Sequence, residues 1–96
     1  MNRQGILRVV AKFRDNHAAD YGIMRIGLFG SAARGDLAED SDVDIVVELA
    51  DADLLALIGI KQELEVLLRR PVDLVRYRES MNGFLKQRIE QEAVYV

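Results

Sequence analysis

The first twenty residues carry apolar side chains at the spacing of an α-helix. Four of them fall at positions i, i+3, i+4 and i+7, on one helix face: Ile6, Val9, Val10 and Phe13. The chain then reaches Tyr21-Gly22, where glycine readily takes the left-handed conformation that ends a helix. We therefore expect a helix over residues 2–19.

Three later runs have the apolar character of β-strands: residues 25–29, 43–49 and 72–77. The run 43–49 is the clearest, because its side chains alternate between two different faces. Those faces are Val43, Ile45, Val47 and Leu49 on one side and Asp42, Asp44, Val46 and Glu48 on the other. Pro71 precedes the third run, a place where the missing N–H of proline is tolerated.

Helical segments are expected between and after these strands. Ser31 can cap a short turn over 31–34, Asp51 or Asp53 can cap a longer helix to about Arg69, and Ser80 can cap a last helix over 81–93. The residues expected to face the core are Leu54, Leu57, Ile58, Leu64 and Leu68 in the longer helix and Phe84, Leu85 and Ile89 in the last. This order predicts an α/β (α+β) fold, with a small mixed β-sheet packed by helices in a single domain over 1–96.

Composition limits the classes of protein to consider. Of 96 residues, 50% are hydrophobic and 30% charged, which is typical of a globular domain rather than a disordered or fibrous chain. The chain has no cysteine, which excludes a disulfide scaffold and a thiolate metal site. It has no apolar run as long as a membrane span and no signal-peptide core near Met1. We therefore expect a cytoplasmic protein that does not insert into membranes.

Charge is unevenly distributed along the chain. The net charge is −3, yet residues 36–60 carry eight Asp or Glu and no Lys or Arg. An acidic protein is a poor candidate for non-specific nucleic-acid binding, so we expect no direct contact with nucleic acid. The acidic block is either a solvated loop or a site for a cation.

Gly30-Ser31 follows a predicted strand and opens a predicted helical turn. Such a turn presents backbone N–H groups and a hydroxyl to a phosphate. Glycine suits this position because the chain can approach a ligand without a Cβ in the way. Taken alone, the turn is a weak signal, because most such turns are simple helix caps.

Asp42 and Asp44 lie at the start of the strand 43–49, two residues apart and on one face. Their separation along the strand is about 6.5–7 Å, and two carboxylates on one face can bind the Mg²⁺ ions of phosphoryl-transfer chemistry. The alternative is a polar loop in which the carboxylates only cap and solvate.

Asp73 is an acid within an otherwise apolar strand, where an unpaired charge is unfavourable. If its strand lies beside 43–49, Asp73 completes a set of three carboxylates with Asp42 and Asp44. It can then bind metal and accept the proton of an attacking hydroxyl. The alternative is an edge-strand carboxylate that faces water or pairs with an arginine: Arg69, Arg70 or Arg76.

These residues together resemble a known family. Gly30-Ser31, ten intervening residues and Asp42-x-Asp44, followed later by Pro71-Val72-Asp73, are similar to the minimal nucleotidyltransferases of the DNA polymerase beta superfamily. The resemblance covers nearly the whole chain. It implies the nucleotidyltransferase (polymerase beta palm-like) fold.

The resemblance also implies roles for single residues. Gly30 and Ser31 would hold the triphosphate of ATP, and Asp42, Asp44 and Asp73 would bind Mg²⁺ in a two-metal site. Arg34 is similar to a phosphate contact, although Arg34 and Asp36 could equally form a structural ion pair. The implied reaction is attack of an acceptor hydroxyl on the α-phosphorus of ATP, with transfer of AMP and release of pyrophosphate.

Family members of this size resemble antitoxins encoded beside HEPN-type toxins, which they neutralise by transferring AMP to a tyrosine. The resemblance therefore implies a HEPN toxin as acceptor and partner, in a hetero-oligomer. Two alternatives remain open: a non-catalytic antitoxin that acts by occlusion, and an adenylyltransferase of a small molecule such as an antibiotic.

Other polar residues are expected to have structural roles. His17 is expected at the surface near the end of the first helix, and Tyr77 and Tyr95 are expected to pack. Arg69-Arg70 is interpreted as a cation pair at a helix C-terminus, where positive charge opposes the helix dipole, or alternatively as a docking patch.

Overall fold

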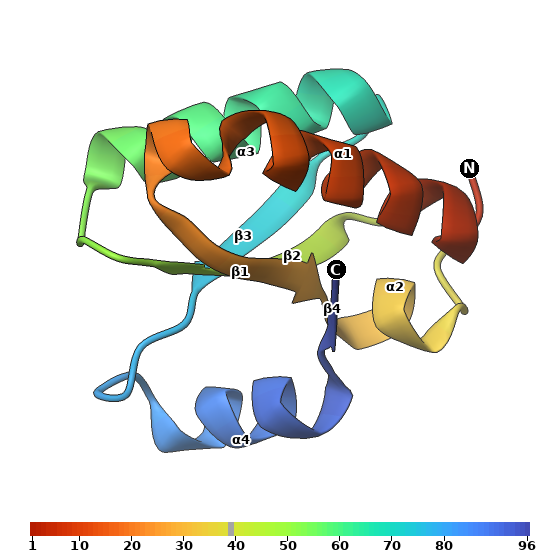
Figure 1. The fold of residues 1–96 in the computed structure, drawn as a ribbon. Helices are drawn as coiled ribbons and strands as arrows, with labels where there is room; N and C mark the ends of the chain where they lie inside the picture. The colour runs from red at the N-terminus through yellow and green to blue at the C-terminus, as the bar shows by residue number, and fades with distance from the viewer. Residues whose placement is uncertain (39) are drawn as a thin grey trace.

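A computed structural model describes residues 1–38 and 40–96 (Figure 1). Its elements, in chain order, are α1 (Arg3–Tyr21), β1 (Ile23–Leu28), α2 (Gly30–Arg34), β2 (Val43–Leu49), α3 (Leu54–Leu68), β3 (Val72–Arg76), α4 (Gly83–Glu92) and β4 (Val94–Tyr95). Every helix and strand expected from the sequence is present. The two-residue strand β4 was not expected, because so short a run carries no periodic pattern.

The strands form one mixed sheet in the order β3-β2-β1-β4. β1 pairs antiparallel with β2 and with β4, whereas β2 and β3 run parallel. The parallel register sets Asp44 opposite Asp73. The predicted small mixed sheet is therefore confirmed, and so is the placement of the strand that carries Asp73 beside the strand that carries Asp44.

Helices cover both faces of this sheet. Figure 1 shows α1 and α3 side by side on one face, and α4 across the other. The alternating apolar residues of β2 enter the core beneath α1 and α3, where Val43, Ile45 and Val47 are fully buried. A second cluster lies beneath α4: Phe29, Val46, Tyr77 and Ile89. The strand β2 is thus buried on both faces, and its acidic residues lie at the margins of the second cluster.

Three helices begin at residues whose side chains accept hydrogen bonds from the first turn. Asn2 accepts from Gly5 N at 2.9 Å, and Asp53 accepts from Leu55 N at 3.0 Å. The last helix is capped by Asn82, which accepts from Leu85 N at 3.1 Å, and not by Ser80 as predicted. The amide oxygen of Asn82 reaches the third residue of the helix, while Ser80 lies in the preceding turn.

The predicted inner face of α3 is correct in part, since Leu57 packs against the core as expected. Leu64 and Leu68 are buried as expected, but Leu54 and Ile58 are exposed, at 71% and 44%. The buried stripe is Ala56, Ile60, Leu64 and Leu68. Apolar residues occur all round this helix, so periodicity alone could not select the inner face.

Gly59 does not interrupt α3, although a glycine within a helix lowers its propensity. A Cβ at this position would lie 2.9 Å from the Tyr21 hydroxyl oxygen, so glycine allows α1 and α3 to approach closely.

In α4, Ile89 is buried and Leu85 packs beside it as expected, but Phe84 is 75% exposed. The short helix α4 buries only a narrow stripe.

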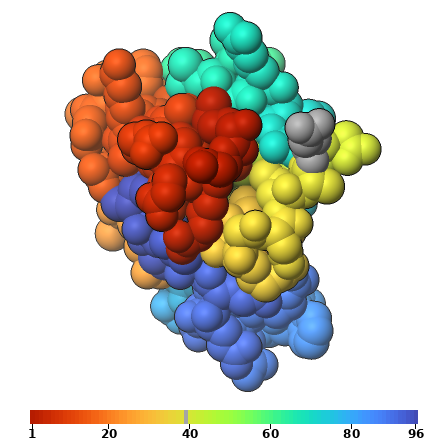
Figure 2. Space-filling view, turned by 90° about the vertical axis from the view of Figure 1, so that its right-hand side faces the viewer, coloured from red at the N-terminus to blue at the C-terminus, as the bar shows by residue number. Residues whose placement is uncertain are grey.

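The short helix α2 reaches the surface between two other segments. Figure 2 shows the exposed part of α2 and the loop after it in yellow, bordered by the N-terminal part of α1 in red and by α4 in blue. Within the described residues, no helix combines the length and the apolar character needed to cross a bilayer.

Candidate active site

The turn between β1 and α2 is attached to β2. Phe29 N donates to Asp44 O at 3.1 Å, and the next residue, Gly30, has a φ of 65°, in the left-handed region. A Cβ built on Gly30 would overlap the Asp44 carboxylate, whose Cγ would lie only 3.2 Å away. Glycine therefore has two reasons to be here: its backbone conformation and the close approach of Asp44.

Ser31 lies in the first turn of α2, next to Gly30 and partly exposed. It does not cap the helix as predicted, because the N-cap residue is Phe29, which makes no side-chain capping bond. The helix therefore starts at Gly30, one residue earlier than predicted. The first N–H groups of α2 thus remain free of a side-chain cap, beside the Asp44 carboxylate.

The structure brings two of the predicted carboxylates together across neighbouring strands. Asp44 and Asp73 are in register on β2 and β3, and adjacent strands lie about 4.8 Å apart. Asp44 is half-buried, whereas Asp73 is exposed on the edge strand. In the described part of the chain neither forms an ion pair, so the alternative in which Asp73 pairs with an arginine is not found, while its exposed position on an edge strand is.

Burial raises the pKa of the Asp44 carboxyl above its ordinary value, and the adjacent Asp73 carboxylate raises it further. Asp42, which is exposed at the entry to β2, adds to this effect. The guanidinium of Arg88 on α4 acts in the opposite direction and lowers the pKa of Asp44. The negative charges of Asp42 and Asp73 therefore both act on the Asp44 carboxyl.

Arg88 is a residue that sequence reasoning missed. It comes 44 positions after Asp44 on the exposed side of a helix, where an arginine is ordinary. No spacing rule links the two residues. Only the folding of α4 across the sheet places this positive charge near Asp44.

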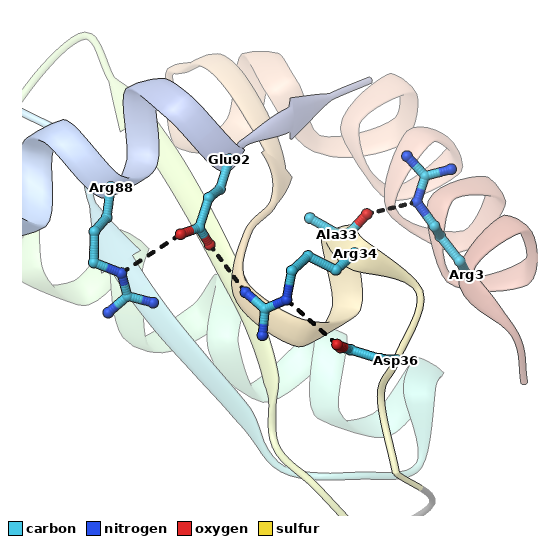
Figure 3. A network of polar contacts seen from close by, with 6 residues as sticks. All are labelled: Arg3, Ala33, Arg34, Asp36, Arg88 and Glu92. Carbon is cyan, nitrogen blue, oxygen red and sulfur yellow. Dashed lines mark hydrogen bonds and ion pairs between the residues drawn. The ribbon is translucent and has the colours of Figure 1, made fainter.

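Arg34 belongs to a network of ion pairs drawn in Figure 3. Its Nε lies 3.4 Å from Asp36 Oδ2 and its Nη1 lies 3.2 Å from Glu92 Oε1. The Arg34–Glu92 ion pair ties α2 to α4, and Glu92 also lies 3.7 Å from Arg88 Nε within α4. The ion pair with Asp36 is therefore present, and a phosphate contact by the half-exposed Arg34 stays a prediction.

The carboxylates are chemically suited to a divalent cation. Among the described residues, no three acidic or histidine side chains converge on a closed metal cage. Mg²⁺, however, usually keeps several waters and binds through one or two carboxylates together with substrate phosphates. Asp44 and Asp73 offer such an open pair, since a cation would relieve the repulsion that raises the pKa of Asp44.

Several polar residues outside the site have the structural roles expected of them. His17 lies 3.2 Å from Glu63 Oε2 and 3.3 Å from Asp20 Oδ2 at the surface. Tyr77 is buried and donates to Glu90 at 2.8 Å. These contacts confirm a surface role for His17 and a packing role for Tyr77.

The raised pKa of Asp44 predicts how the stability of the metal-free protein depends on pH. Above the ordinary value of 3.8, the folded state keeps a proton that the unfolded chain has lost. The free energy of unfolding therefore falls as the pH rises from that value through the folded-state pKa. We expect Asp44→Asn, which cannot ionise, to melt at a higher temperature than the wild type at neutral pH.

Thermal melts in a chelator, from about pH 3 to neutrality, measure this effect. The advantage of Asp44→Asn should shrink as the pH falls and disappear below 3.8. Asp51→Asn, at an exposed carboxylate beyond the end of β2, is the control and should follow the wild type. An Asp44→Asn protein no more stable than the wild type at neutral pH would contradict the prediction.

Comparison with known proteins gives a consistent result. The family model described as nucleotidyltransferase domain matches residues 9–96. The protein adenylyltransferase MntA of Thermococcus cleftensis is 42% identical over 77 residues, which span 79% of this chain and 77% of that protein.

Solved structures agree with the sequence comparison. A toxin-antitoxin crystal structure with AMP-PNP has a TM-score of 0.76 and 30% identity, and the match covers 92% of this chain and 69% of that chain. A tri-AMPylated HEPN toxin of Shewanella oneidensis in complex with an MNT antitoxin has a TM-score of 0.70 and 30% identity. That match covers 97% of this chain and 70% of the other.

Proposed function

The chain belongs to the nucleotidyltransferase domain family, and on that premise we propose that it transfers AMP from ATP to a tyrosine hydroxyl of a HEPN-type toxin. One observation carries the proposal. The Gly30 turn is pressed against Asp44, and Asp44 lies in register with Asp73 on the next strand. The turn at Gly30 and two carboxylates thus come together from three separate segments, which supports a role of the turn in binding phosphate.

The proposed reaction is an in-line substitution at the α-phosphorus of ATP. The acceptor oxygen forms a bond to that phosphorus, the bond to the β-phosphate oxygen breaks, and pyrophosphate leaves. The acceptor proton passes to a carboxylate, and Asp73 is the candidate because it is exposed beside Asp44. Free N–H groups at Gly30 and Ser31 hold the triphosphate, and positioning supplies much of the rate.

We propose that Mg²⁺ is held by Asp42 and Asp44, with Asp73 as the third carboxylate. When bound, it neutralises phosphate charge as pyrophosphate departs. The chain contributes acids that already repel one another, as the raised pKa of Asp44 indicates. Arg88, and Arg34 if it leaves its ion pairs, would add positive charge on the α4 side of the site.

The toxin partner is proposed from the relatives. The Shewanella oneidensis structure pairs an MNT antitoxin with an AMPylated HEPN toxin, and the Thermococcus cleftensis relative is named a protein adenylyltransferase. By the same logic this chain would act as the antitoxin in a hetero-oligomer.

Labelled ATP tests the proposal directly. The protein is incubated with Mg²⁺, ATP labelled on the α-phosphate and the HEPN toxin encoded beside it. We expect label on the toxin and loss of its toxicity, and neither when Mg²⁺ is chelated. A toxin whose acceptor tyrosine is replaced by phenylalanine is the matched control and should remain unlabelled.

Two other results would overturn the proposal. Neutralisation of the toxin without ATP, and without label, would indicate occlusion by a non-catalytic antitoxin. Label on an antibiotic or another small hydroxyl compound, with none on the toxin, would indicate a small-molecule adenylyltransferase.

A further inference from the structure

Arg70 joins the end of α3 to the loop that leads into β2. Its Nε donates to Ser41 O at 3.1 Å, and its Nη2 donates to the same oxygen at 2.8 Å. The same Nη2 also donates to Ala38 O. The side chain is half-buried in this position. One guanidinium therefore holds two carbonyl groups that lie 29 and 32 residues away along the chain.

These contacts lie directly beside the predicted metal ligands. Ser41 is followed by Asp42, and the next residue, Val43, donates its N–H to Pro71 O at 3.0 Å. On the other side, Val72 N donates to Glu65 Oε2 at 2.9 Å, immediately before Asp73. Arg70 thus lies where the starts of β2 and β3 meet, with an acid of the site just inside each strand.

We propose that Arg70 is a positioning residue that holds the backbone at Ser41 and thereby directs the Asp42 and Asp44 carboxylates toward a shared divalent cation. This inference rests on the proposed function, because it assigns a role within the same site. Arg70 does not touch substrate in this arrangement, and it acts through the loop that it binds. The interpretation of Arg69-Arg70 as paired helix-end cations is corrected for Arg70, whose charge is directed to the loop.

Because the carboxylates of the site repel one another, the loop at Ser41 must be restrained to keep them close together. Asp44 and Asp73 are in register on neighbouring strands, and Asp42 precedes Asp44 by two residues. The exposed Asp42, on a free loop, would turn away from the other two carboxylates in the absence of a cation. A loop held at Ser41 keeps Asp42 near them before the cation arrives, so less ordering is required when it binds.

The geometry requires arginine rather than positive charge alone. A guanidinium presents several N–H groups in a rigid plane, and here two of its nitrogens serve Ser41 O while one also serves Ala38 O. A lysine ammonium is a single point donor on a flexible stem. Lysine would keep the positive charge but could not donate hydrogen bonds from two nitrogens to Ser41 O.

The test compares Arg70→Met, Arg70→Lys and the neighbouring Arg69→Met. Arg69 is exposed and ends α3 in the left-handed conformation with a φ of 55°. Arg69→Met therefore removes the same charge at a side chain that is directed elsewhere. Three quantities are measured: hydrogen exchange of amides 40–44 in the free protein, the Mg²⁺ concentration that gives half-maximal AMP-PNP binding by calorimetry, and kcat for AMP transfer.

For Arg70→Met we expect faster exchange over residues 40–44 and a loss of about 10–100-fold in Mg²⁺ affinity and in kcat, the range found for groups that orient metal ligands. Arg70→Lys, which keeps the charge, should resemble Arg70→Met more than the wild type. Arg69→Met should stay within about twofold of the wild type. If Arg70→Met does not fold, Arg70→Lys decides the question.

Arg70 has no positioning role if Arg70→Lys matches the wild type in all three measurements, or if a folded Arg70→Met matches Arg69→Met. Failure of the proposed function is a different result. In that case the wild type transfers no AMP and binds no AMP-PNP, while the exchange comparison still reports whether Arg70 holds the loop.

Discussion

Asp44→Asn is expected to lower kcat for AMP transfer by at least about 10³-fold, since charge stabilisation of several kcal/mol corresponds to about three decades in rate. Asp44 is the acid that the Gly30 turn approaches and that Asp73 faces across the strands. Asparagine has nearly the same shape and lacks the negative charge. The variant should therefore fold normally, and be more thermostable at neutral pH, while it loses its activity.

Transfer of label from ATP to the toxin, under single-turnover conditions, measures this loss. Asp51→Asn is the matched control, because Asp51 is an exposed acid in the same acidic block, just after β2 ends. We expect Asp51→Asn to retain wild-type kcat. An Asp44→Asn protein that kept more than about a tenth of the activity would show that this carboxylate is dispensable.

Among substitutions that add one methyl group to the site, Gly30→Ala is expected to be the most disruptive. At a φ of 65° a non-glycine residue costs about 1–2 kcal/mol. The new Cβ would also overlap the Asp44 carboxylate, and forcing atoms into a packed position costs about 1–3 kcal/mol more. The free energy of unfolding should fall by about 2–5 kcal/mol, and AMP-PNP binding should be lost because the turn and Asp44 are pushed apart.

Gly22→Ala separates the two causes. Gly22 has nearly the same φ, 68°, but the nearest atom to an added Cβ is the Ala50 Cβ at an ordinary distance of 3.8 Å. This variant should lose about 1–2 kcal/mol and bind AMP-PNP as the wild type does. Denaturant unfolding and calorimetry measure both effects. Equal losses in the two variants would mean that the approach of Gly30 to Asp44 has no energetic consequence.

Local features of the molecule could be predicted from the sequence because their causes are local. The alternation along β2 predicted both its extent and the side on which Asp44 lies. A glycine after a strand predicted the turn at Gly30, where the φ of 65° excludes most other residues. These features depend on residues only a few positions away, so they can be predicted from the amino-acid sequence.

Helix faces and helix starts were predicted less well, for physical reasons that differ. In α3 the apolar residues surround the helix, so its inner face was selected by contact with α1 and the sheet. In α4 two candidate caps, Ser80 and Asn82, stood close together. The path of the chain after β3 determined that Asn82 reaches the first turn.

By itself, the sequence determined the elements, the acidic residues and the family resemblance, since each follows from spacing along the chain. Only the tertiary structure decided that Asp73 stands opposite Asp44, that Arg34 pairs with Glu92, and that Arg70 reaches Ser41. Strand register and long side-chain contacts depend on how helices and sheet pack, and that packing minimises free energy over the whole chain. Local spacing cannot encode a contact whose geometry is set by residues 29 or more positions away.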